Sequence, residues 1–150
     1  MTSAAPTIHD PDAEDVLLAS MAAGCWPTEP VPPEDFHRLL NRDLAEVLGV
    51  VRLLGTRPTV RSIVRGLRAL GVRGPHLEVA VERILDATPV AVRVDELALR
   101  IRSLAWRRRV ALRLDRLRAL LLEPAVSEAD INAELDAFVS LAAAQPQEGP

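Results

Sequence analysis

Side chains that could carry out chemistry are few in this sequence, and they lie far apart. None of His9, His37 and His76 has a second His, a Cys or a carboxylate at the spacing of a zinc site. Cys25 is the only cysteine, which excludes an internal disulfide and a thiolate metal cluster within one chain. Lysine is absent, which removes the phosphate-binding loop of ATPases and Schiff-base chemistry. We therefore expect no catalytic residue, no metal and no cofactor, and we predict that the protein is not an enzyme.

Two further groups could form a site. Cys25 beside Trp26 could be a nucleophile, but it lies in a proline-rich linker with no base assembled near it, so we interpret it as a packing residue. A cluster of acids near the N-terminus resembles a paired-carboxylate site, although the helix dipole also favours acids at a helix start, which we take as the better explanation. These acids are Asp10, Asp12, Glu14 and Asp15.

Charge is strongly segregated along the chain, although the formal net charge is only −3. Residues 1–35 hold seven acids and 123–150 hold six, with no base in either segment, whereas residues 100–118 hold eight arginines and one acid. The densest point, Arg107–Arg109, could touch phosphates. It could equally be a solvated face, or form salt bridges to Glu134 and Asp136 on a following helix.

The spacing of apolar residues predicts an all-α protein, and the 3% aromatic content argues against sheets. Helices are expected over residues 11–23, 34–54, 60–70, 75–87, 92–122 and 128–142. Cys25–Pro33, with four prolines in nine residues, is expected to be an extended linker on the surface. Thr59 is expected to cap the third helix, and Gly24, Gly55 and Gly71 are expected to end the first three.

The predicted helix over Val92–Leu122 is the dominant feature, because it holds nine of the eighteen arginines and no Gly or Pro. At 1.5 Å per residue it would be roughly 45 Å long, more than one small core can cover. Its apolar stripe consists of Leu97, Ile101, Leu104, Val110, Leu114, Leu117 and Leu121. Ser127–Asp130 resembles a capping box and opens a return helix with Ile131, Leu135, Phe138 and Ala142 on one face. The two helices predict a projecting antiparallel hairpin.

We expect one domain. Residues 1–10 and 144–150 are expected to be disordered tails, residues 11–90 a globular core of about four helices, and residues 91–143 the hairpin of the same domain. No apolar run is long enough to span a membrane and no signal-peptide pattern is present, so we expect a cytoplasmic protein.

The segments, taken in order, resemble the N-terminal collar domain of DnaB-type replicative helicases over residues 12–141. The matching segments are Ala13–Met21, Pro33–Arg38, Gly55–Thr59, Thr88–Pro89, Arg107–Val110 and Ile131–Phe138. The sequence departs from the family at His37, where the family has Tyr, at Val60, where it has an acid, and at Gly74–Leu77.

The resemblance implies an all-α bundle with a C-terminal hairpin, in which hairpins pair into dimers, dimers form a three-fold collar, and the collar contacts primase. The family's motor domain is not found in this sequence, and the Met1–Ser3 start suggests a stand-alone copy. Such a copy could recruit primase, cap or load a helicase, or compete with a collar. The predicted partners are a second copy and primase or replicative helicase.

We expect apolar anchors within or between hairpins, with arginines setting partner choice through charge. The expected interface residues are Leu104, Arg107, Arg108, Arg109, Leu112, Leu121, Leu135 and Phe138. The alternative is a helix-turn-helix DNA-binding regulator over residues 59–85, with the hairpin as dimerisation arm. Its DNA contacts would be Arg61, Arg65, Arg68 and Arg73. A third possibility is a helical bundle without any partner.

Overall fold

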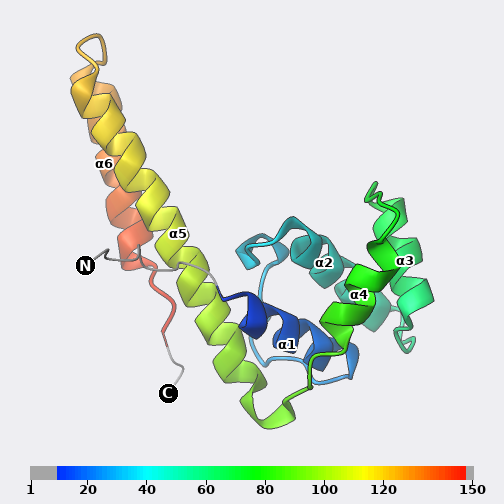
Figure 1. Ribbon diagram of the computed structural model, residues 1–150. Helices are drawn as coiled ribbons and strands as arrows, with labels where there is room; N and C mark the ends of the chain where they lie inside the picture. Colours follow the sequence, from blue (N-terminus) through cyan, green and yellow to red (C-terminus); the bar gives the residue numbers. More distant parts are fainter. Residues whose placement is uncertain (1–9, 148–150) are drawn as a thin grey trace, which may run out of the picture.

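The computed structural model describes residues 10–147, and all regular structure in this part of the chain is helical (Figure 1). The α-helices are α1 (Pro11–Ala22), α2 (Leu39–Leu53), α3 (Val60–Ala69), α4 (Leu77–Leu85), α5 (Val94–Leu122) and α6 (Glu128–Ala143). Two short 3₁₀ turns, η1 (Pro33–Asp35) and η2 (Ala91–Arg93), precede α2 and α5. The predicted all-α fold is confirmed. The tails predicted over 1–10 and 144–150 lie outside the described residues at 1–9 and 148–150.

The predicted helix boundaries agree with the observed caps at several positions. Asp10 belongs to α1 rather than to a tail, because its Oδ1 accepts the Ala13 amide N–H at 3.0 Å. Thr59 and Ser62 form a reciprocal capping box at the start of α3. Gly24 and Gly55 follow α1 and α2 with φ of 92° and 66°, a conformation that favours glycine.

The prediction that the second helix begins at Glu34 is wrong, since α2 begins at Leu39. Glu34 lies in the η1 turn, and Phe36 has an extended backbone. Asp35 and Phe36 are both buried. Asp35 ends the η1 turn and contacts α5, while Phe36, which follows with an extended backbone, enters the core.

The linker before η1 also differs from its prediction. Cys25–Pro33 has no regular structure until η1, but Pro27 and Val31 are buried. The linker therefore covers part of the core instead of lying only on the surface.

A globular part, which we call the head, consists of α1–α4, the linker with η1, and the first half of α5. Helix α1 packs against α2, α4 and α5, and α3 packs against α2 and α4 (Figure 1). The large core side chains are Leu17, Leu18, Phe36, Leu44, Leu48, Ile63, Leu67, Val81, Ile84 and Ile101. Ser20 joins α1 to the segment before α5, because its Oγ accepts the Val90 N–H at 3.0 Å.

The second half of α5 leaves the head and packs against α6 as an antiparallel hairpin (Figure 1). A projecting hairpin is thus present, but the prediction that it begins at residue 91 is wrong, because Val94, Ala98 and Ile101 of α5 are buried in the core of the head. The predicted apolar stripe is only partly buried: Leu114 and Leu121 are exposed, while Ala98 and Ala105, which the stripe omits, are buried. Small side chains suit these two positions, because the first half of α5 packs closely on α1.

Two helical glycines give a test of the packing between α2 and α3. A Cβ at Gly66 would lie 2.7 Å from Cγ1 of Val47, whereas a Cβ at Gly49 would meet no atom within 4 Å. We expect Gly49→Ala to raise the free energy of unfolding by about 0.5–1 kcal/mol. Gly66→Ala should lower it by about 1–3 kcal/mol, because valine is too rigid to move away. Urea denaturation measures both, and equal shifts would contradict this packing.

Candidate functional site

The first half of α5 is bound to the linker and η1 through side chains that repeat every seven residues along the helix. Positions 95, 102 and 109 lie on one side of α5, because seven residues are nearly two turns. The contacts are Asp95 Oδ1 with the Thr28 N–H at 2.6 Å, Arg102 Nη2 with Glu29 Oε2 at 3.0 Å, and Arg109 Nη1 with Asp35 Oδ1 at 2.5 Å. They fix the direction in which the hairpin leaves the head.

Asp35 is the most deeply placed of these partners, with a relative exposure of 4%. Its carboxylate accepts a hydrogen bond from Arg109, and its backbone carbonyl accepts one from Nη2 of Arg108. A buried carboxylate without a cation would be strongly unfavourable, so Asp35 depends on α5 for its charge balance.

Glu14 is a second buried carboxylate at this junction, with 2% exposure. Its two oxygens accept the His37 amide N–H at 2.5 Å and Nδ2 of Asn41 at 2.8 Å. Asp10 caps α1, and Asp12 and Glu14 lie in its first turn, which agrees with the helix-dipole explanation of the N-terminal acids. Glu14 satisfies polar groups at the entry to α2. We call Glu14, Asp35, Asn41, Arg108 and Arg109 the junction cluster.

Burial changes the protonation of groups in and beside this cluster. It lowers the pKa of the Arg108 guanidinium, and the negative charge of Glu14 opposes this shift. Burial also raises the pKa of the Asp15 carboxyl, which Arg38, at 3.5 Å, partly opposes. The folded protein binds a proton at Asp15 more readily than the unfolded chain does, so this carboxyl lowers stability as the pH rises through its pKa.

Other polar contacts hold the two helices of the hairpin together. Glu134 is buried between Arg113 and Arg116, with N–O distances of 2.9 and 3.3 Å. Trp106 Nε1 donates to the Leu141 carbonyl at 2.8 Å. The suggested salt bridges from Arg107–Arg109 to Glu134 and Asp136 are wrong, because the partners of Glu134 lie one and two turns further along α5.

The three successive arginines have different environments. Arg108 and Arg109 both contact Asp35 of the head, so both side chains interact within the chain. Arg107 is exposed, and within residues 10–147 no acid forms an ion pair with it. Of the three, Arg107 is therefore best placed to meet a partner.

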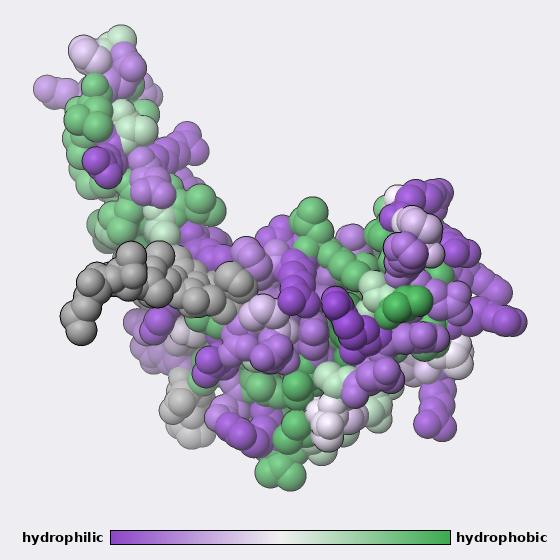
Figure 2. Space-filling view, in the orientation of Figure 1, coloured by the Kyte–Doolittle hydropathy of each residue, from purple (hydrophilic) through white to green (hydrophobic). Residues whose placement is uncertain are grey.

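One side of the hairpin carries exposed apolar side chains, which we call the flank: Leu114, Leu121, Leu135 and Val139. Helix periodicity aligns the two α5 residues with Val110 and Leu117, and aligns the two α6 residues with Ile131 and Phe138. Figure 2 shows hydrophobic side chains gathered along an edge of the projecting hairpin. Arg107 lies seven residues before Leu114, so it borders the flank.

The remaining predicted interface residues are less exposed or lie outside the flank. Leu104, in the first half of α5, and Phe138, beside the flank on α6, are half-buried. Leu112 is exposed in a shallow groove with Ala137 and Leu141, on the side opposite to the flank. The structure therefore divides the predicted interface residues between two sides of the hairpin and the junction cluster.

The arginines predicted for DNA contact are exposed on the head. Arg61, Arg65 and Arg68 lie on the outer side of α3, and Arg73 follows in the connection to α4. Within residues 10–147, none of the four forms an ion pair. However, seven residues separate α3 from α4, more than the three or four of a helix-turn-helix.

The other candidate residues are not brought together. His37 and His76 are exposed and far apart in the sequence, Cys25 is half-buried, and His9 lies outside the described residues. In the described part of the chain, no three His, Cys, Asp or Glu side chains are grouped to hold a metal ion.

No protein-family model matches the chain, and a search of curated proteins finds no similar sequence. None of the described helices has the length and apolar character needed to cross a membrane.

The contacts of the junction cluster predict that two arginine substitutions, one in α5 and one in η2, differ in their effect on stability. Arg109→Gln should lower the free energy of unfolding by about 1–3 kcal/mol, because it leaves the buried Asp35 carboxylate without its main partner. Arg93→Gln removes a fully exposed pair with Glu96 and should change the free energy of unfolding much less than Arg109→Gln does. Thermal and urea unfolding compare the two variants, and equal losses would show that the Asp35 contact contributes little.

Proposed function

We propose that this protein is a non-enzymatic protein-interaction module of DNA replication. It associates with a second copy through the hairpin and binds primase or the replicative helicase. The head with a projecting hairpin supports this proposal, because it is the arrangement that the resemblance to the DnaB-type collar domain implies.

The observation that carries the proposal is the flank. Its four large apolar side chains are exposed to solvent in the single chain. Because they lie on one side of the hairpin, a single partner could cover all four. The second half of α5 has α6 on one side only, so a second hairpin can cover the flank as in a four-helix bundle. Because the same surface would be used by both copies, the contact would be two-fold symmetric.

Charge at the edge of the flank supports a role in partner selection. Arg107 is exposed at this edge, whereas Arg108, Arg109, Arg113 and Arg116 contact acidic residues of the same chain. A rim charge of this kind affects the rate and specificity of association more than its strength.

Two valines with the same exposure, 62%, test the flank directly. Val139 lies on α6 in the flank, and Val79 lies on α4 in the head. We expect Val139→Glu to convert a dimer into a monomer in sedimentation velocity, because it places a charge in the apolar contact. Val79→Glu should leave the dimer unchanged. A dimer that survives Val139→Glu, or that Val79→Glu also disrupts, would contradict self-association through the flank.

The unpaired arginines of α3 favour a second candidate function, which is binding to DNA or another polyanion. The exposed Glu78 and Glu82 on α4 oppose insertion of that helix into DNA, so any contact would be made by α3 alone.

Fluorescence anisotropy with a duplex of about 20 base pairs separates the two functions. We expect weak binding to the duplex that changes little in the Arg61→Glu/Arg65→Glu variant. Tight, salt-sensitive binding that this variant loses would instead favour DNA binding as the function. Arg93→Glu is the control, because it makes the same charge change at a residue outside α3.

A further inference from the structure

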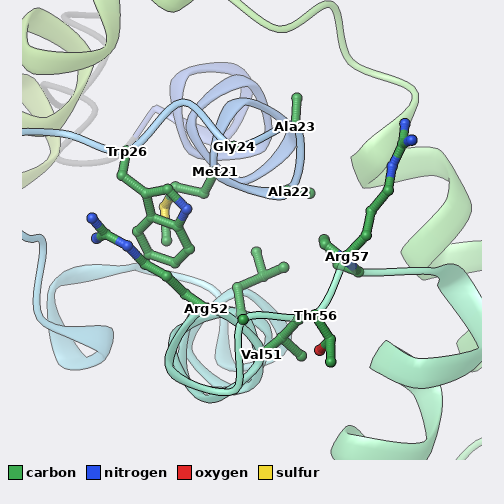
Figure 3. A pocket seen from close by; sticks show the side chains of 12 residues that line it. Met21, Ala22, Ala23, Gly24, Trp26, Val51, Arg52, Thr56 and Arg57 are labelled. Carbon is green, nitrogen blue, oxygen red and sulfur yellow. The ribbon is translucent and has the colours of Figure 1, made fainter.

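A second exposed apolar surface lies on the head, at the ends of α1 and α2. It is a groove of about 490 Å³ between Met21–Gly24 at the end of α1 and Val51–Pro58 at the end of α2 (Figure 3). The positive φ values of Gly24 and Gly55 turn the chain away after each helix. Neither glycine has a side chain to fill the space that remains. This volume can hold several apolar side chains.

Trp26 and two arginines give the groove its chemical character. The Arg52 guanidinium lies over the Trp26 ring, 4.5 Å from its centroid (Figure 3). This cation–π contact orients Arg52 and leaves its N–H donors available. Arg57 stands at the opposite rim, and the groove has no acidic residue in its lining. Within residues 10–147, neither arginine forms an ion pair.

The apolar surface continues beyond this groove. A neighbouring groove of about 330 Å³ also contains Met21 and Trp26 and extends along α2 to the exposed Val50 and Leu53. The two grooves together form a largely apolar surface, with Arg52 and Arg57 in the first groove and one acid, Glu46, in the second. A ligand that fits it would combine apolar side chains with carboxylates.

The tip of the hairpin has this composition. Residues 119–131 contain three acids and no base. Leu122, at the end of α5, is 73% exposed, and Glu123 next to it and Glu128 at the start of α6 are also exposed. Leu122 lies a quarter turn or more from Leu121 around the helix, outside the flank. The tip is therefore available even when the flank is covered.

The tip and the groove cannot meet within one chain, because the hairpin projects away from the part of the head that holds α1–α3 (Figure 1). We infer that the groove of one copy accepts the hairpin tip of a second copy, with Leu122 against Trp26 and the tip acids near Arg52 and Arg57. This contact joins two different surfaces, so it would build a ring or a chain of copies instead of a closed dimer. It goes beyond the proposed pairing through the flank and does not depend on it.

A charge exchange tests the contact in the Val139→Glu background, where pairing through the flank is removed. In this background, sedimentation equilibrium up to about 1 mM protein should show a mass that increases with concentration. Arg57→Glu should weaken this association roughly tenfold or more, and Glu123→Arg should do the same, because each brings like charges together. Both changes together should restore association, because the opposite charges meet again with their positions exchanged.

Arg65→Glu is the matched control, since Arg65 is an exposed, unpaired arginine of α3 that does not line the groove. It should leave association unchanged. The inference is overturned if the Val139→Glu parent stays monomeric, if Arg65→Glu weakens association as much as Arg57→Glu, or if the double exchange does not restore it. Failure of the flank proposal is seen separately, as a Val139→Glu protein that is still a closed dimer at low concentration.

Discussion

The direction of the hairpin depends on the contacts that bind α5 to the linker and η1. Asp95, Arg102 and Arg109 hold one side of the helix at intervals of two turns. Because α5 is a single uninterrupted helix of 29 residues, fixing its first half also fixes its second half. The hairpin is therefore presented by the head as a rigid arm, and α6 packs on the part of that arm which the head leaves uncovered.

The same contacts determine where charge is available on the surface. In the described chain, most arginines of α5 are balanced by acids of the head, the linker or α6. The arginines near the end of α2 and on α3 have no such partners, and the tip of the hairpin is acidic. The molecule thus has a basic, partly apolar head surface at one end and an acidic, partly apolar tip at the other.

Local features of the fold could be predicted from the sequence, because they depend on neighbouring residues. Thr59 with Ser62 marks the start of α3, Gly55 marks the end of α2, and the apolar spacing on α5 and α6 indicates a hairpin. The junction cluster could not be predicted in this way. Asp35 and Arg109 are 74 residues apart, and nothing local distinguishes Asp35 or Glu14 from a solvated acid. The seven-residue spacing of Asp95, Arg102 and Arg109 could have indicated that these three side chains lie on one side of a helix, but it does not identify their partners.

The clustered arginines illustrate the same limit. Arg107–Arg109 are identical in type and adjacent in the sequence, yet Arg108 and Arg109 contact Asp35 and Arg107 does not, since successive positions on a helix differ by about 100°. Likewise, Trp26 and Arg52 become parts of one groove only because the linker passes beside α2.

Size-exclusion chromatography with light scattering tests the interaction role most directly, first on the protein alone and then after mixing with the host primase and replicative helicase. We predict at least a dimer that co-elutes with one of these two proteins. A monomer that elutes separately from both would contradict a role as a self-associating module of the replication machinery.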